Sequence, residues 1–253
     1  MKPLLIAIIL GLFTNSVWAW GANCKYEREL ERVVDIEGAE RLTVIAGAGL
    51  LVIEGDERAD IVIKAKLCSE DEDLLAKMDV SSVVSSGSIG IETEFPKKSW
   101  GGNKQMTIDL ELSIPSKLNL QVADSSGEAS VKDVASLNMK DSSGELNIHN
   151  IAGDLEVVDS SGEMELSNIG GNAKVTDSSG AMSVKNIKGN FVVEADSSGD
   201  IDVKNVKNDV LIKRDSSGSI EVQSVGGNFT VQADGSGGIR HSEIAGQVSL
   251  PKK

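Results

Sequence analysis

The chain has 253 residues, of which 39 are acidic and 25 basic, and its formal net charge is −14 at neutral pH. Nucleic acids and anionic lipid surfaces repel such an acidic chain, so we expect no nucleic-acid partner. Beyond residue 19, no stretch approaches the roughly 18 consecutive apolar residues of a membrane span, so the sequence also predicts no membrane insertion.

Residues 1–19 have the pattern of a cleavable secretory signal peptide. One positive charge, Lys2, precedes an apolar run from Leu4 to Phe13, and the small residue Ala19 ends the segment. We therefore expect an exported bacterial protein, either periplasmic or extracellular and on the cell surface, whose mature chain starts near Trp20.

Cys24 and Cys68 are the two cysteines of the sequence. In an oxidising compartment they favour a disulfide, which would constrain the N-terminal region. Two free thiols are the alternative. A metal site is less favoured because no histidine lies near them.

Residues 20–122 are expected to form degenerate β circuits and a cap. The segments 49–53 and 86–91 each carry a glycine followed by alternating apolar residues, as the repeats downstream do. A short inserted helix is predicted near residues 70–78. Ser69 would cap it, acidic residues fill its first turn, and Leu74, Leu75 and Met78 share one face.

The polar segment from Pro96 to Lys104 is interpreted as a hairpin loop between two strands. It contains Trp100, one of very few aromatic side chains outside the regular repeats. Exposed aromatic rings are suited to partner binding, so this loop is a possible binding loop. The alternative is a tryptophan packed against its own hairpin.

Residues 123–253 contain an internal repeat. The motif Asp-Ser-Ser-Gly recurs every 17 to 19 residues, and a decayed copy begins at Asp234. After each motif, apolar and polar residues alternate in two short runs, which indicates strands. Two strands of about five residues and two tight corners leave no room for a helix. The motifs begin at Asp124, Asp141, Asp159, Asp177, Asp196 and Asp215.

This period predicts an all-β fold, a single-stranded parallel β-solenoid or β-helix. Each circuit would have 17–19 residues and two short strands, each paired in parallel with the same strand of the next circuit. Circuits of 19 residues place one extra residue before the aspartate, such as Ala195, which we interpret as a bulge. The C-terminal residues would form a cap. An antiparallel sandwich is the second interpretation, although it does not require a constant period.

The recurring motif is interpreted as corner architecture. Alternation places Asp159 on the same side as Leu155 and Val157, so its carboxylate would point inward and accept backbone N–H groups. Glycine would take the backbone angle that other residues resist. A ladder of cations on the six aspartates is the alternative, and no cofactor is expected. The corner glycines are Gly127, Gly144, Gly162, Gly180, Gly199 and Gly218.

No catalytic residue is predicted. His149 and His241, the two histidines, fall in different circuits, and alternation directs His149 outward. A nucleophile triad needs one histidine between nucleophile and carboxylate. Outward acidic residues such as Glu163 and Glu221 are instead expected beside lysines such as Lys185 and Lys204 of neighbouring circuits, as on a solvated sheet surface.

The chain resembles a known family. The phrase Ala39-Glu40-Arg41-Leu42, the early cysteines, and serial Asp-Ser-Ser-Gly with Asn-Ile-x-Gly or Val-Gly-Gly-Asn corners resemble the bacterial putative-adhesin family of β-strand-repeat proteins, whose function is otherwise unassigned. The resemblance covers the chain from about Cys24 onward. It implies an exported envelope β-solenoid with a role in adhesion and no catalytic residues.

We therefore expect a non-catalytic binding or scaffold protein of the cell envelope, with an unknown protein or glycan as its partner. Two alternatives stay open. Some polysaccharide-cleaving enzymes are parallel β-helices with acidic clusters, although they need long loops that these repeats lack. A calcium-dependent binding module is the other.

Overall fold

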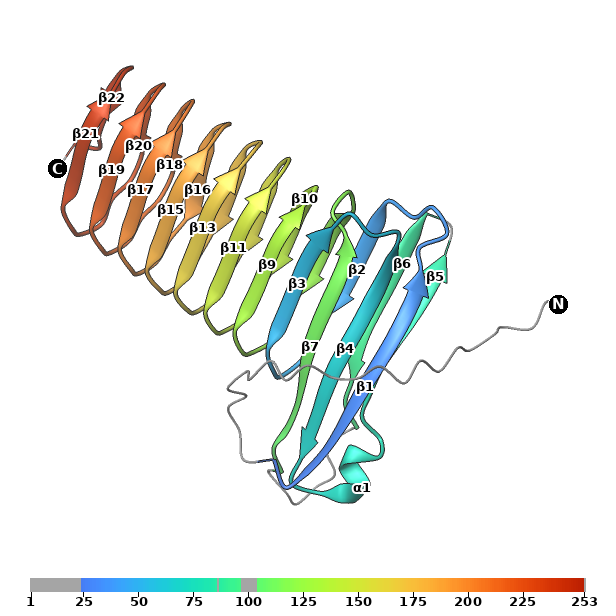
Figure 1. Cartoon of the computed structure of the whole chain (residues 1–253). Helices are drawn as coiled ribbons and strands as arrows, with labels where there is room; N and C mark the ends of the chain where they lie inside the picture. Colours follow the sequence, from blue (N-terminus) through green and yellow to red (C-terminus); the bar gives the residue numbers. More distant parts are fainter. Residues whose placement is uncertain (1–23, 86, 97–103, 253) are drawn as a thin grey trace.

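The computed structural model describes residues 24–85, 87–96 and 104–252. Two sheets of eleven strands each face one another, and the circuits stack from the N-terminal strands to β21 and β22 (Figure 1). One sheet, sheet A, contains β1 (Tyr26–Asp35), β4 (Asp60–Ser69), β7 (Met106–Pro115), β3 (Leu51–Asp56), β9 (Ala129–Val134), β11 (Leu146–Ile151), β13 (Met164–Ile169), β15 (Met182–Ile187), β17 (Ile201–Val206), β19 (Ile220–Val225) and β21 (Ile239–Ile244), in that order.

The second sheet, sheet B, runs along the opposite side of the coil. Its strands, in spatial order, are β22 (Val248–Ser249), β20 (Phe229–Val231), β18 (Val210–Ile212), β16 (Phe191–Ala195), β14 (Ala173–Thr176), β12 (Leu155–Val158), β10 (Ser136–Lys140), β8 (Asn119–Ala123), β2 (Arg41–Ile45), β6 (Ser88–Glu94) and β5 (Asp79–Ser85).

The core forms because alternate residues of both sheets point inward. In β13, Met164 and Leu166 are buried whereas Glu165 is exposed. Met164 lies in register with Leu146 on one side and Met182 on the other, so like residues stack in ladders through the coil. Burying each such aliphatic side chain stabilises the fold by about 1.5–3 kcal/mol.

The predicted parallel β-solenoid is confirmed, and the antiparallel sandwich is excluded. From β8 to β22 every neighbouring pair is parallel, with two short strands per circuit. The predicted bulge is present in the first circuit of 19 residues, where the register shifts so that Thr176 pairs with Ala195.

The N-terminal circuits depart from the expected arrangement. Segment 49–53 contributes to β3, which pairs in parallel with β9 as predicted. Segment 86–91 contributes to β6, which lies in sheet B and pairs in parallel with β2, as a strand of a degenerate circuit does. The other neighbour of β6 was not expected: it is β5, which pairs with it antiparallel. A glycine before an alternating run also marks a hairpin turn, and Gly87 has a positive φ of 80°.

The segment from Pro96 to Lys104 is not a hairpin loop. β6 pairs with β2 and β5, whereas β7 pairs with β3 and β4, so the segment connects the two sheets. Alternation shows which face of a strand is buried but not which strand lies beside it. Trp100 falls in residues 97–103, outside the described part of the chain.

The predicted helix is present but begins later and is shorter. α1 spans Glu72–Leu75, and its N-cap is Asp71, whose carboxylate accepts the Leu74 N–H at 3.1 Å. Ser69 instead ends β4, paired with Met106 of β7, so its backbone stays extended. Leu75 and Met78 are buried, which explains how so short a helix is held.

The predicted disulfide between Cys24 and Cys68 is confirmed, with 5.4 Å between the Cα atoms. It fastens the start of β1 to the end of β4, next to the pair Tyr26 and Ser69. β1 and β5 form antiparallel edges of the two sheets at this end of the coil.

Stacked corner glycines generate a stability prediction. Gly162 has a φ of +148°, and a Cβ there would lie 1.6 Å from the carbonyl oxygen of Gly144. We expect Gly162→Ala to lower the free energy of unfolding by about 2 kcal/mol or more, and the Tm by about 4–8 °C. Thermal unfolding measures this. The control is Gly238→Ala, whose Cβ would meet nothing within 4 Å. Equal effects of the two substitutions would contradict the stacked geometry.

Candidate functional site

Asparagines are stacked along the coil at the corner where the strands of sheet A end, and together they form a ladder. The residue before the last in each strand adopts a left-handed backbone conformation, with φ of 58° at Asn150, 60° at Asn168, 62° at Asn186 and 61° at Asn205. Asparagine tolerates this conformation better than most residues. The local kink turns the next apolar residue, such as Ile187, into the core.

The side-chain amides of this ladder bond to one another. Asn168 Nδ2 donates to Asn150 Oδ1 at 2.9 Å, Asn186 Nδ2 to Asn168 Oδ1 at 2.9 Å, and Asn205 Nδ2 to Asn186 Oδ1 at 3.1 Å. A primary amide has two N–H donors and two acceptor lone pairs. The ladder uses one donor and one lone pair of each central amide, so one of each is left for a ligand.

An open groove of about 940 Å³ runs along this ladder. We call it the asparagine groove. Its wall contains the four asparagines and two lysines, Lys188 and Lys207, that occupy the same place in adjacent circuits. In the part of the chain that the structure describes, neither lysine belongs to an ion pair, so both ammonium groups are available to a ligand.

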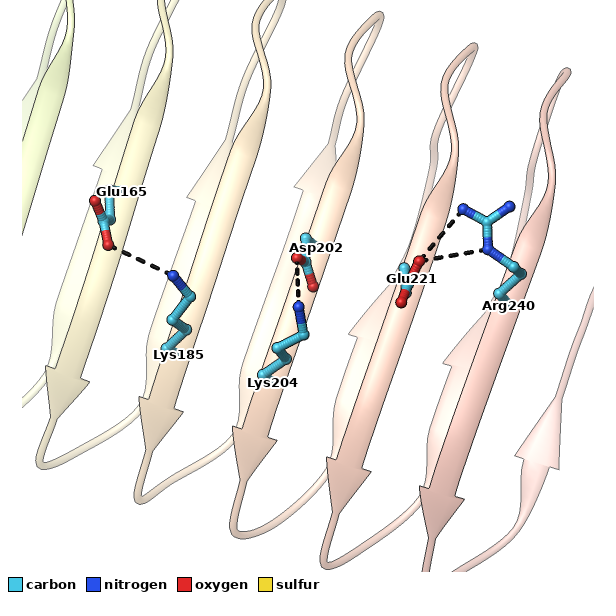
Figure 2. A network of polar contacts seen from close by, with 6 residues as sticks. All are labelled: Glu165, Lys185, Asp202, Lys204, Glu221 and Arg240. Atoms are coloured by element: carbon cyan, nitrogen blue, oxygen red, sulfur yellow. Dashed lines mark hydrogen bonds and ion pairs between the residues drawn. The ribbon is translucent and has the colours of Figure 1, made fainter.

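Several lysines on the strands of the coil are paired. Lys185 lies 3.7 Å from Glu165, and Lys204 lies 2.8 Å from Asp202 (Figure 2). The expected pairing between neighbouring circuits is present for Lys185 and Glu165. Lys204 instead pairs with Asp202 of its own strand, and Glu221 pairs with Arg240 of the next circuit at 3.3 Å. Glu163 is not the partner of Lys185, because Glu165, which lies within the strand, is nearer to the ammonium group.

The next corner position carries a second ladder, which bonds side chains to the backbone. Asp154 Oδ1 accepts the Asn172 N–H at 2.7 Å, and Asn172 Oδ1 accepts the Asn190 N–H at 3.0 Å. Asp209 Oδ1 accepts the Asn228 N–H at 2.6 Å in the same way. These bonds join each corner to the same corner of the next circuit and so help to hold the circuits in register.

The Asp-Ser-Ser-Gly motifs lie at the other corner, between sheet B and sheet A, and their aspartates point inward. All six are buried, with 1–4 % of each residue exposed. At Asp159, Oδ1 accepts the backbone N–H groups of Ser160 at 2.6 Å and Ser161 at 3.3 Å. We call the six residues the aspartate column; they are Asp124, Asp141, Asp159, Asp177, Asp196 and Asp215.

Burial raises the pKa of every carboxyl in the aspartate column. For Asp124, burial and then the neighbouring charge of Asp141 raise the pKa to about 7. For Asp196, burial and then the charges of Asp177 and Asp215 raise the pKa to about 6. The backbone N–H groups of the serines oppose this shift, because they favour the ionised form.

The remaining titratable residues of interest lie apart. His149 Nδ1 lies 2.6 Å from Ser167 Oγ, and the His241 ring lies 6.0 Å from that of Phe229. Across residues 24–85, 87–96 and 104–252 there is no group of three or more His, Cys, Asp or Glu side chains arranged to hold a metal ion. Over the same ranges, no helix is long and apolar enough to cross a membrane.

The asparagine groove was not among the residues expected to bind a ligand. Its signal in the sequence is the Asn-Ile pair that recurs at Asn150, Asn168 and Asn186 with the period of the Asp-Ser-Ser-Gly motif. Recurrence alone does not tell a corner residue from a ligand-facing one. The possible binding loop at Trp100 lies outside the described residues.

These features define a parallel β-solenoid with polar ladders at its corners and an open groove along one of them. The chain belongs to the Toastrack DUF4097 family, whose model matches residues 54–250. The resemblance to a bacterial putative-adhesin family, stated from the sequence, agrees with this membership.

Solved structures from several bacteria are similar to this chain. They include a putative cell adhesion protein from Clostridium sporogenes, at 15% identity over 90% of this chain and 100% of that one, with a TM-score of 0.36. A putative adhesin from Bacteroides fragilis has 15% identity over 88% and 97%, with a TM-score of 0.41. A putative lipid binding protein from Parabacteroides distasonis has 17% identity over 88% and 97%, with a TM-score of 0.44. No curated protein matches the chain.

The asparagine ladder generates a second stability prediction. Asn186→Gly removes two amide hydrogen bonds but tolerates the left-handed backbone, whereas Asn186→Ala removes the same bonds and adds backbone strain. We expect the alanine variant to be less stable than the glycine variant by about 1–2 kcal/mol. Urea unfolding of both variants measures the difference. Alanine equal to or more stable than glycine would show that the backbone conformation is not a constraint.

Proposed function

We propose that this protein is an exported, non-catalytic binding protein that holds an extended ligand, a protein segment or a glycan chain, along the asparagine groove. One observation carries the proposal: a column of amides, each with a free donor and a free acceptor, lines an open groove of about 940 Å³. Adjacent amides are one strand spacing apart, about 4.8 Å, which suits a polymer that repeats its own polar groups.

The chemistry of the groove supports binding and not catalysis. Its lining consists of amide, hydroxyl, aliphatic and backbone groups, together with Lys188 and Lys207. Side-chain amides do not ionise near neutral pH, and general acid–base catalysis needs a group whose pKa lies near the working pH. The carboxyls with such pKa values belong to the aspartate column, at the other corner and inside the core.

Rigidity also supports binding of an extended ligand. The groove residues belong to consecutive circuits that are joined by parallel pairing in both sheets. A ligand that binds them orders no loop, so little conformational entropy is lost by the protein. Many weak contacts in a row can then give a useful affinity.

Export is part of the proposal. The signal-like residues 1–19 and the disulfide between Cys24 and Cys68 support it, because disulfides persist in the periplasm and outside the cell. Adhesion would follow if the ligand belongs to another cell or surface, and a scaffold role would follow if it belongs to the same envelope.

A triple substitution tests the groove. The full chain, immobilised, is exposed to a glycan array and to envelope extract, and bound material is compared with that of Asn168→Gly/Asn186→Gly/Asn205→Gly. Because glycine keeps the backbone and removes the amides, we expect binding to fall at least about tenfold with the coil still folded.

The matched control places three glycines at the opposite corner, as Ser142→Gly/Ser160→Gly/Ser178→Gly. These serines are exposed, and their backbone N–H donors are retained in glycine. The control should bind as the unmodified chain does. Equal binding by the groove variant, the control variant and the unmodified chain would exclude the asparagine groove as the binding site.

A further inference from the structure

We propose that the aspartate column shares protons, with protonated carboxyls donating their O–H to carboxylates of adjacent circuits. The folded coil would then bind protons that the unfolded chain releases, and the corner would loosen as these protons leave. This property does not depend on the asparagine groove or on its ligand.

The backbone holds the six carboxyls in a tight stack. The N–H of Asp141 donates to the carbonyl of Val158 at 2.9 Å, and the N–H of Asp159 donates to that of Thr176 at 2.9 Å. Asp196 and Asp215 are themselves bridge partners. Neighbouring aspartates are therefore about one strand spacing apart, roughly 4.8 Å, with carboxyls that point into the same buried space.

Each stacked carboxyl is left half-satisfied by the backbone. In Asp141, Asp159, Asp177 and Asp196 the buried Oδ2 has no hydrogen-bond donor. Leaving an ionised oxygen in this state is unfavourable, because it loses water and gains no partner. A proton on one carboxyl converts it into a hydrogen-bond donor to the next carboxyl, so that the unpartnered Oδ2 atoms of the column gain hydrogen bonds.

Asp124 at the start of the column shows this most directly. Neither of its carboxyl oxygens accepts a hydrogen bond, and both are buried beside Asp141 of the next circuit, since the Asp124 N–H donates to the carbonyl of Lys140 at 2.8 Å. Two ionised carboxylates cannot bond to each other, whereas a proton on either one would let it donate its O–H to the other. Burial, and then the charge of Asp141, raises the pKa of Asp124 to about 7, which favours its protonated form below that pH.

The charged groups that face the column are acidic. Each member faces its neighbours in the column, and Asp215 also faces Asp234 and Asp200. Lys140 and Arg214 precede Asp141 and Asp215, but their side chains are exposed. Among the described residues, neither forms an ion pair with the column. Without a facing cation, protons are the means of reducing the repulsion.

The direction of the pH effect follows from linkage. The folded carboxyls have pKa values above the ordinary 3.8, as high as about 6 at Asp196 and about 7 at Asp124. The fold therefore favours their neutral forms. This contribution to stability is complete below about pH 4 and is lost as the pH rises through 6 and 7. Ion-paired carboxylates act oppositely: the hydrogen bond from Lys104 lowers the pKa of Asp71, so its contribution is lost only in acid.

Thermal unfolding of the full chain between pH 4.5 and pH 8 tests the proposal. We expect the Tm of the unmodified chain to fall by several degrees between pH 5 and pH 8. In Asp177→Asn/Asp196→Asn the amides imitate neutral acids, so the Tm should depend less on pH and should equal or exceed that of the unmodified chain at pH 8. The control is Asp154→Asn/Asp209→Asn, in exposed positions of the second ladder where neighbouring circuits already have asparagine. It should keep the full pH dependence.

Infrared spectroscopy of the folded, unmodified chain gives a second readout that does not depend on any variant. At pH 6 free aspartates are ionised, so a carbonyl stretch of protonated carboxylic acid should report the column. The band should weaken in Asp177→Asn/Asp196→Asn and persist in the control. Absence of this band, or a Tm that does not fall between pH 5 and pH 8, would overturn the proposal. A Tm at pH 8 that rises with calcium and falls with chelator would also overturn it, since a cation would then hold ionised carboxylates.

Discussion

In-register stacking is the constraint on which this structure depends: each residue of the coil meets its counterpart in the next circuit at a fixed distance of about 4.8 Å. A residue whose side chain interacts favourably with an identical side chain in the next circuit is therefore favoured in every circuit. Aliphatic side chains such as Met164 and Met182 satisfy this condition by packing, and asparagines such as Asn168 and Asn186 satisfy it because an amide both donates and accepts. An ionised carboxylate does not satisfy it.

The two corners of each circuit satisfy this constraint with different residues. The exposed corner uses amides and leaves part of their hydrogen-bonding capacity facing solvent, whereas the corner of the Asp-Ser-Ser-Gly motifs buries acids beside one another. The glycines of these motifs stack so closely that a single Cβ would collide with a carbonyl oxygen of the previous circuit. The same repetition thus produces a surface suited to a ligand on one side and a buried acidic column on the other.

The regular half of the fold could be predicted from the sequence because parallel, in-register pairing makes the sequence period equal to the structural period. Strands, corners and the inward direction of Asp159 follow from spacing and alternation alone. The partner of β6 could not be predicted, since alternation defines a strand's faces and not its neighbours. Ser69 and Asp71 are both good capping residues, and only the pairing of β4 with β7 decides between them. The asparagine groove depends on a left-handed backbone at Asn168 that no residue pattern specifies.

The strand order has a consequence for how the chain folds. β2 and β3 lie inside the coil, between β6 and β7 on one side and β8 and β9 on the other. A chain synthesised from its N-terminus therefore presents its earliest strands well before all of their neighbours emerge. β2 has no partner until β6 is complete at Glu94, and β3 has none until β7 is complete at Pro115. Both strands are paired on both sides only when Val134 has emerged, whereas each later circuit can add to a completed one as soon as it appears. The slow, vulnerable step of assembly lies at the start of the molecule, and the later circuits add one by one to a finished template.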